Sequence, residues 1–245
     1  MTRGDQAGPY RTTAAELAAE VAVMAAALLC MALFARHRFM PAAMAVIIGG
    51  RFLLLNRRGD WVFFLIGVIV GGGNDLLSMY KGVYSYAAPT VLPAPIPLWM
   101  VVFWGQIFVS FRKLMRYGQF LGPDEPPARL LDLPLALDLV VAVVYRLIIY
   151  RTASIPWQPD ALYAAILVTR LLLIPPREHE RKLLLAMLVI GPVYEMILIG
   201  AGFYHYQTGV LFGMPLWLIV YWVFVSRMLK AIFDRVEHFL ARGRT

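Results

Sequence analysis

The chain has 245 residues, of which 60% are hydrophobic and 16% are charged. Soluble domains carry about 25% charged residues, and a chain of this length could not keep so much apolar surface away from water. The composition excludes disordered, collagen-like and soluble globular proteins and indicates a membrane protein. The formal net charge of +8 fits loops that face anionic lipid rather than a nucleic-acid partner. The single cysteine, Cys30, excludes an intrachain disulfide.

Eight apolar segments are candidates to cross a bilayer, which takes about 20 residues. In chain order they are 14–35, 40–56, 61–80, 96–115, 134–151, 160–175, 183–204 and 212–233. The second and sixth are short, and each contains an arginine. We predict an all-α, polytopic membrane helix bundle with about eight transmembrane helices, with seven as the alternative.

Basic residues are distributed unequally between the two sides of this arrangement. Only Arg36, Arg38, Lys81 and Arg151 fall on one side, whereas the termini and the other loops hold the remaining loop arginines and lysines. Cytoplasmic loops are enriched in such residues. We therefore expect both termini in the cytoplasm and a multi-pass protein of the bacterial-type inner (plasma) membrane.

Two stretches of the chain repeat each other at an offset of 120 residues or slightly less. The matched residues are Asp75 with Glu195, Gly82 with Gly202, Tyr84 with Tyr204, Tyr86 with Tyr206, Pro97 with Pro215, Trp99 with Trp217, and Trp104 with Trp222. We predict two tandem four-helix repeats, at 1–116 and 134–245, joined by a cytoplasmic linker at 117–133. An even number of helices in each half gives both the same orientation, as in transporters with parallel repeats. Similarity imposed by membrane composition alone is the alternative.

Ionisable residues inside a membrane are costly and need a partner or a purpose. Glu20 and Arg51 lie at matching depths in the first two predicted helices, and Asp138 and Arg170 do so in the fifth and sixth. We predict two acid–arginine pairs with a structural role. Arg146 and Arg227 have no partner that the sequence identifies.

Asp75 and Glu195 lie beyond the middle of the third and seventh predicted helices, where no cationic side chain is expected. The repeat would make these two acids face one another. A carboxyl group in apolar surroundings favours its protonated form, which could protonate an alkene, whereas the ionised form could stabilise a carbocation or activate water. Asp75 and Glu195 are therefore the catalytic candidates. The alternative is a packing role, with both acids hydrogen-bonded to tyrosines.

Aromatic residues gather at the same predicted level of the membrane. The substrate-binding candidates are Tyr84, Tyr86, Trp99, Trp104, Tyr204, His205, Tyr206, Trp217 and Trp222. Aromatic faces attract positive charge and suit a cationic intermediate, although an interfacial aromatic belt would contain the same residue types. His205 is a candidate proton shuttle. The chain has no HExxH, no CxxC and no glycine-rich phosphate loop, so we expect no metal and no cofactor.

The second stretch, from Glu195 to Trp217, resembles the membrane carotenoid hydratase family. An acidic residue there precedes a glycine, a G-x-Y-x-Y run, another glycine and a helix that begins with proline. The first stretch, with Asn74, Asp75 and the segment 97–104, resembles an uncharacterised family of small bacterial inner-membrane proteins. The first resemblance implies that Glu195, Tyr204 and Tyr206 belong to the site of an isoprenoid-processing enzyme.

These observations lead to one principal functional hypothesis. The chain would be a cofactor-independent membrane enzyme that acts on a lipid-soluble isoprenoid, a carotenoid or terpenoid, by carboxyl-mediated alkene protonation followed by hydration or cyclisation. Its partners would be this small molecule and the membrane, with no nucleic acid. The alternatives are a proton-coupled transporter or lipid carrier and a non-catalytic scaffold protein of the inner membrane.

Overall fold

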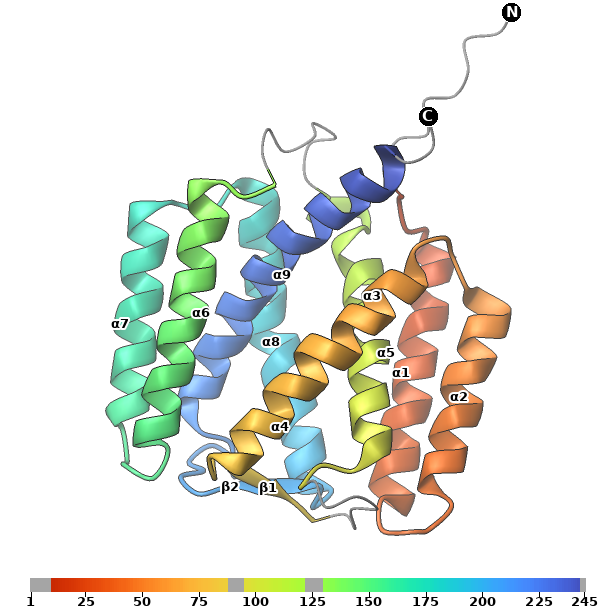
Figure 1. Cartoon of the computed structure of the whole chain (residues 1–245), viewed down its shortest axis with the longest axis horizontal. Helices are drawn as coiled ribbons and strands as arrows, with labels where there is room; N and C mark the ends of the chain where they lie inside the picture. The colour runs from red at the N-terminus through yellow and green to blue at the C-terminus, as the bar shows by residue number, and fades with distance from the viewer. Residues whose placement is uncertain (1–9, 88–94, 122–129, 243–245) are drawn as a thin grey trace, which may run out of the picture.

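The computed structural model describes residues 10–87, 95–121 and 130–242, and these form a helical bundle (Figure 1). The elements of the first half are α1 (Ala14–Phe34), α2 (Met40–Leu55), α3 (Asp60–Ile66), the π-helical turn η1 (Gly67–Gly71), α4 (Gly72–Tyr80), strand β1 (Tyr84–Tyr86) and α5 (Leu98–Met115). Helices α3 and α4 continue each other through η1, so together they correspond to the third predicted span.

The second half has the same order of elements. After a short 3-10 turn, η2 (Gly118–Phe120), it comprises α6 (Leu133–Thr152), α7 (Gln158–Leu173), α8 (Glu178–Gly200), strand β2 (Tyr204–Tyr206) and α9 (Leu216–Arg242). Residues 122–129 of the predicted linker at 117–133 lie outside the described residues, as do 1–9, 88–94 and 243–245 of the two predicted repeats.

The chain is a multi-pass integral membrane protein. Among the described residues, six helical stretches are long and apolar enough to cross a membrane: 14–34, 60–80, 98–115, 133–152, 178–200 and 216–241. The two short predicted spans correspond to α2 and α7, which have 16 residues each. Helices of that length rise about 24 Å, less than the hydrocarbon thickness of about 30 Å.

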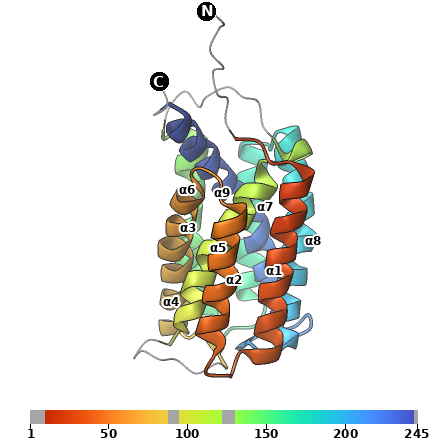
Figure 2. The same cartoon turned by 90° about the vertical axis from the view of Figure 1, so that its right-hand side faces the viewer.

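Helices α1 and α2 lie on one side of the bundle and α6 and α7 on the other, with α5 and α8 between them (Figure 1). Helices α9 and α3–α4 run obliquely past these, and α9 packs against α7 and α8 while α3 packs against α5. The described chain begins and ends at the same end of the bundle, as both views show (Figure 2). The two strands close the opposite end.

Local sequence signals explain where several helices begin. Thr13 and Glu16 form a capping box at the start of α1, in which each side chain satisfies a free backbone N–H group. The Asp132 side chain accepts a hydrogen bond from the Leu135 N–H at the start of α6, 3.0 Å away. Asp60 at the start of α3 accepts one from the Arg57 N–H at 2.9 Å.

The seventh predicted span, 183–204, extends past the end of the observed helix. Helix α8 ends at Gly200, and Gly202 has φ +71°, a left-handed conformation that ends helices and favours glycine. Helix α4 ends in the same way before Gly82, with φ +68°. After each of these helices the chain turns across the end of the bundle, so the tyrosines that follow lie in strands β1 and β2 and not at helix ends.

Candidate functional site

The two strands pair with each other across the two halves of the chain. Their antiparallel register joins Tyr84 to Tyr206, Ser85 to His205 and Tyr86 to Tyr204. Because Tyr84 corresponds to Tyr204 and Tyr86 to Tyr206, the two outer pairs are equivalent, which is the pattern of an approximate twofold axis through the central pair. The strand pair therefore connects matching points of the two halves.

Alternate residues of this strand pair face opposite sides. The four tyrosine rings contact one another, with centroids 5.3–5.9 Å apart. His205 is exposed on the other face, and its Nε2 lies 3.1 Å from Oγ of Ser85, its partner on the neighbouring strand. The structure thus separates His205 from the candidate tyrosines.

Asp75, on α4, accepts three hydrogen bonds from aromatic side chains. The Tyr84 hydroxyl donates to Oδ1, while Tyr86 Oη and Trp104 Nε1 donate to Oδ2 at 2.6 and 2.7 Å. Asp75 as a whole residue is 3% exposed. These four residues belong to the first of the two repeated stretches, and the structure brings them into direct contact.

Glu195, on α8, has the corresponding surroundings. The Tyr204 hydroxyl donates to Oε2, and Trp222 Nε1 donates to Oε1 at 3.0 Å. No hydrogen bond joins Tyr206 to Glu195 among the described contacts, so Glu195 accepts two such bonds where Asp75 accepts three. The Tyr206 ring instead packs edge-on against Trp217, 5.8 Å between centroids.

Two matched glycines allow the tryptophans to reach the acids. A β-carbon added at Gly71 would lie 2.5 Å from the Trp104 ring, and one added at Gly191 would lie 2.5 Å from Trp222 Cγ. Real side chains do not approach so closely, so only glycine permits this packing at either position. The close contact holds each indole N–H in reach of its carboxylate.

A cavity of about 740 Å³, here called the polar cavity, lies beside both acids. It is lined by η1, α4, α5, α6 and α9, with single residues of β1, β2 and α8. Of the predicted site residues, those that line it are Asp75, Tyr84, Trp104, Glu195, Tyr206, Trp217 and Trp222. Tyr86 and Tyr204 contact the acids without lining it, and Trp99 packs against Phe203, 5.3 Å between ring centroids.

Arg146 of α6 also lines the polar cavity, which corrects the prediction that no cation lies at this depth. Asp75 and Arg146 lie five and six residues from the ends of α4 and α6 at the strand side, about 8 and 9 Å along each helix. The guanidinium donates to Ser78 Oγ at 3.3 Å and to the Tyr221 hydroxyl. The sequence of α6 does not specify which helix Arg146 faces.

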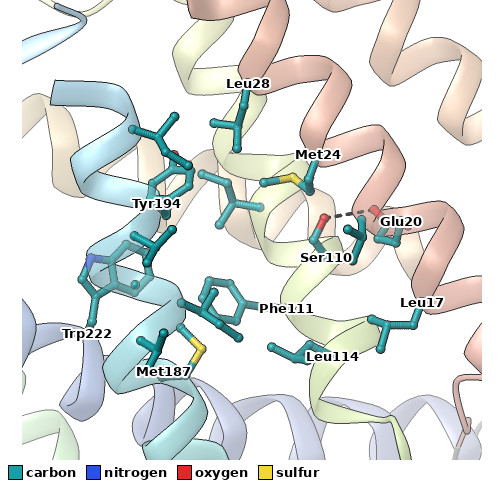
Figure 3. A pocket seen from close by; sticks show the side chains of 17 residues that line it. Leu17, Glu20, Met24, Leu28, Ser110, Phe111, Leu114, Met187, Tyr194 and Trp222 are labelled. Carbon is teal, nitrogen blue, oxygen red and sulfur yellow. Dashed lines mark hydrogen bonds between the residues drawn. The ribbon is translucent and has the colours of Figure 1, made fainter. Parts of the chain in front are cut away.

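A second groove, of about 400 Å³, lies between α1, α5 and α8 (Figure 3). Six of the nine residues of η1 and α4 that line the polar cavity have counterparts in the second groove 120 positions later. Ile69, Val70, Gly71, Gly73, Asn74 and Leu77 line the polar cavity, and Val189, Ile190, Gly191, Val193, Tyr194 and Ile197 line the second groove. The two openings are thus related positions in the two halves, with different side chains.

Tyr194 is the polar residue of the second groove that sequence reasoning missed. Its hydroxyl is buried and makes no hydrogen bond within the described structure. Figure 3 shows Tyr194 and Trp222 facing Met24 and Leu28 of α1 across the groove. Trp222 and Phe111 line both openings and stack 6.0 Å apart, so they form a wall between them.

The predicted acid–arginine pairs lie toward the other end of the bundle. Arg51 is 3.1 Å from Glu20, and Arg170 is 2.7 Å from Asp138, which confirms both pairs. Arg51 also contacts Asp60 at 2.7 Å, and Asp60 pairs with Arg112. These buried ions neutralise one another and are structural. Within the described residues, no group of three or more His, Cys, Asp or Glu residues could hold a metal ion.

Comparison with protein families gives two matched regions, residues 16–119 and 142–242, for a family described as proteins of unknown function (DUF2878). The chain belongs to the DUF2878 family. Asp75 with its three hydrogen-bond donors lies in the first matched region, and Glu195 with its two donors lies in the second. Both halves of the candidate site are therefore within the family's domain.

Curated proteins give no match to this DUF2878 sequence. Two solved structures are similar: a mycobacterial Insig homolog, MvINS from Mycobacterium vanbaalenii, and a cross-linked MvINS trimer. Each is 21% identical, with a TM-score of 0.57 over 76% of this chain and 96% of that chain. At this identity the similarity concerns the fold.

Proposed function

We propose that this membrane protein binds a lipid-soluble small molecule in the polar cavity. The observation that carries the proposal is the cavity itself, about 740 Å³ in size, because small-molecule sites measure about 300–1,000 Å³ and combine apolar walls with a few convergent polar groups. Asp75, Glu195 and Arg146 supply those polar groups here. The resemblance of the second stretch to carotenoid hydratases favours an isoprenoid as the ligand.

The mouth of the polar cavity favours entry from the bilayer. Val70 and Leu77 on one side, and Val143 and Leu147 on the other, line the cavity and are more than half exposed. Exposed apolar side chains of a membrane protein face lipid. A ligand dissolved in the bilayer would therefore reach the cavity between α4 and α6 without passing through water.

Gly73→Leu tests this proposal. Gly73 lines the cavity, and a β-carbon there meets no atom within 4 Å, so the position accepts a side chain, and leucine, a good helix former, would occupy cavity space. Native mass spectrometry of protein extracted in mild detergent should find a bound lipid-soluble molecule, with occupancy at least tenfold lower in Gly73→Leu. Gly49→Leu, on α2 with the same free space, is the control and should keep wild-type occupancy. Equal occupancy in all three proteins, or none in the wild type, would refute binding in this cavity.

A carboxyl-catalysed reaction on the bound isoprenoid is a second candidate, favoured by the presence of two acids on one cavity. The Glu195 carboxyl would donate its proton to an alkene carbon, and the resulting carbocation would take a water molecule, which returns a proton to the carboxylate. Attack by an internal alkene followed by proton loss would give cyclisation instead. Nearby aromatic faces would stabilise the cation, while the charge of Arg146 opposes it.

Glu195→Gln tests the reaction separately from binding. Glutamine keeps an acceptor for Tyr204 or Trp222 but cannot donate an acidic proton. With an acyclic carotenoid in proteoliposomes, the wild type should form a product heavier by one water molecule, or an isomer in the case of cyclisation. Glu195→Gln should form none while still binding the substrate. Unchanged turnover would eliminate the mechanism.

Two other hypotheses have less support. A cavity beside the acids disfavours a non-catalytic scaffold. A transporter with discontinuous helices would fit helix breaks at Gly71–Gly73 and at Gly191–Pro192. Helix α8 is instead continuous through Pro192, and only the π-helical turn η1 interrupts α3–α4.

We also propose the finer architecture that the repeat predicts. Two four-helix repeats, 1–116 and 134–245, would be related by an axis along the membrane normal, and all eight helices would cross the membrane with both termini in the cytoplasm. The strand register, the paired acids and the two family matches support the repeat. The common end of the described termini supports an even number of crossings.

A further inference from the structure

We infer that the ligand of the polar cavity carries an anionic head group, a carboxylate or a phosphate, that binds the guanidinium of Arg146, with an apolar chain directed toward the bilayer. This inference rests on the proposed binding function and specifies the chemical class of the ligand.

Arg146 reaches the cavity with much of its hydrogen-bonding capacity unused. Its Nη1 donates to Ser78 Oγ and its Nη2 to the Tyr221 hydroxyl, and its Cζ lies 4.5 Å from the centre of the Tyr221 ring. A guanidinium has five N–H donors. Among the described residues, no carboxylate oxygen lies within 4.0 Å of its nitrogens.

Two other arginines within the helices, Arg51 and Arg170, are paired with acids. Arg51 contacts Glu20 and Asp60 at 3.1 and 2.7 Å, and Arg170 contacts Asp138 at 2.7 Å. A charge inside a membrane is costly unless it is paired. These neutralised arginines stabilise the fold, whereas Arg146 has its charge directed into a space that a ligand can occupy.

The acids of the polar cavity are already engaged. Asp75 attracts Arg146 electrostatically, but its two oxygens accept hydrogen bonds from three donors, all fixed on other elements. Glu195 is held by Tyr204 and Trp222. Neither carboxylate is therefore a close counter-ion for the guanidinium, and a ligand anion would supply one.

The second groove indicates that the fold itself does not require an arginine at this point. Asp138 corresponds to Glu20, and the same offset takes Arg146 to Leu28, which lines the second groove. At the facing position, Asn74 of the polar cavity corresponds to Tyr194. Because related helix positions pack with leucine in one half, the arginine in the other half is explained by what it binds.

The remaining lining suits the apolar part of such a ligand. Val143 and Leu147 lie on either side of Arg146 along α6 and are exposed, and Val70 and Leu77 line the same cavity from η1 and α4. A head group at Arg146 would thus lie roughly 9 Å inside the helix end, with its chain leaving between α4 and α6. Guanidinium groups bind both carboxylates and phosphates in a bidentate manner, so the experiment must distinguish these anions.

The test compares charged and neutral amphiphiles with the same chain. The full-length protein in phosphatidylcholine nanodiscs is titrated with oleate or oleyl alcohol, and separately with farnesyl phosphate or farnesol, using empty nanodiscs to subtract partitioning. The wild type should bind at least one anion tenfold or more tightly than its alcohol, a difference of about 1.4 kcal/mol. Which pair shows the preference identifies the head group.

Variants assign the preference to one side chain. Arg146→Leu should bind the anion and the alcohol equally, whereas Arg151→Leu, an exposed arginine at the end of the same helix, should keep the wild-type preference. Arg146→Lys keeps the charge without the bidentate geometry and should keep a smaller preference, which provides a test if the leucine variant does not fold. Equal binding of anion and alcohol by the wild type, or equal loss in both leucine variants, would overturn the inference while leaving cavity binding intact. Binding of none of the four amphiphiles, with no co-purified ligand, would overturn both.

Discussion

Replacing Gly191 by alanine tests the close packing that holds Trp222 against Glu195. The added β-carbon would lie 2.5 Å from Trp222 Cγ and 2.8 Å from its Cβ, whereas carbon atoms in contact need about 3.5–4.0 Å. The indole must therefore shift by about 1 Å. Because Trp222 Nε1 donates to Glu195 at 3.0 Å, this shift would also weaken the hydrogen bond.

Gly73→Ala is the matched control for this change. A glycine-to-alanine change within a helix stabilises it by about 1 kcal/mol, and both variants receive that gain. Gly191→Ala also carries the cost of overpacking, about 1–3 kcal/mol, whereas the β-carbon at Gly73 meets nothing within 4 Å. The two variants should therefore differ by about 1–3 kcal/mol in the free energy of unfolding.

Thermal unfolding in detergent, followed by tryptophan fluorescence, measures this difference. At roughly 2–4 °C per kcal/mol for a chain of this size, Gly191→Ala should melt about 2–12 °C below Gly73→Ala. Gly71→Ala should behave like Gly191→Ala, since its β-carbon would lie 2.5 Å from the Trp104 ring. Equal melting temperatures for Gly191→Ala and Gly73→Ala would refute the packing that we describe.

Two further changes test the site and the ion pairs. Tyr204→Phe removes one of the two hydrogen bonds to Glu195. Because a buried acceptor is left unpaired, chemical denaturation should show a loss of about 1–3 kcal/mol in the free energy of unfolding. Ser85→Ala, on the exposed side of the strand pair, should change this free energy little, and an equal loss in both variants would argue against the buried cluster. Arg51→Leu leaves the buried Glu20 carboxylate without its cation, while Asp60 keeps Arg112, and should cost about 3–5 kcal/mol. Arg57→Leu, at an exposed pair, should leave stability nearly unchanged, and a similar loss in both arginine variants would contradict the assigned roles.

The sequence predicts much of the helical framework and both structural ion pairs. Hydropathy locates the helices because the membrane requires long apolar segments. The depth of Glu20 and Arg51 suffices to pair them, since adjacent helices bring residues of equal depth together. The repeat also identifies Asp75 and Glu195 as related positions with aromatic neighbours.

Other features of the site depend on tertiary structure. The strands at 84–86 and 204–206 have three residues each and pair over about 120 positions, so no local periodicity identifies them. The exposure of His205 follows from that pairing. Arg146 meets the polar cavity because α6 of one half lies opposite α4 of the other, and the sequence of one helix does not specify which neighbour it faces.

An experimental density map of the protein in lipid nanodiscs, prepared from native membranes without added ligand, tests the central claim most directly. We predict elongated density in the polar cavity, with its head at the Arg146 guanidinium and its chain leaving between α4 and α6. A cavity that contains only water, or a guanidinium paired directly with Asp75, would contradict the account.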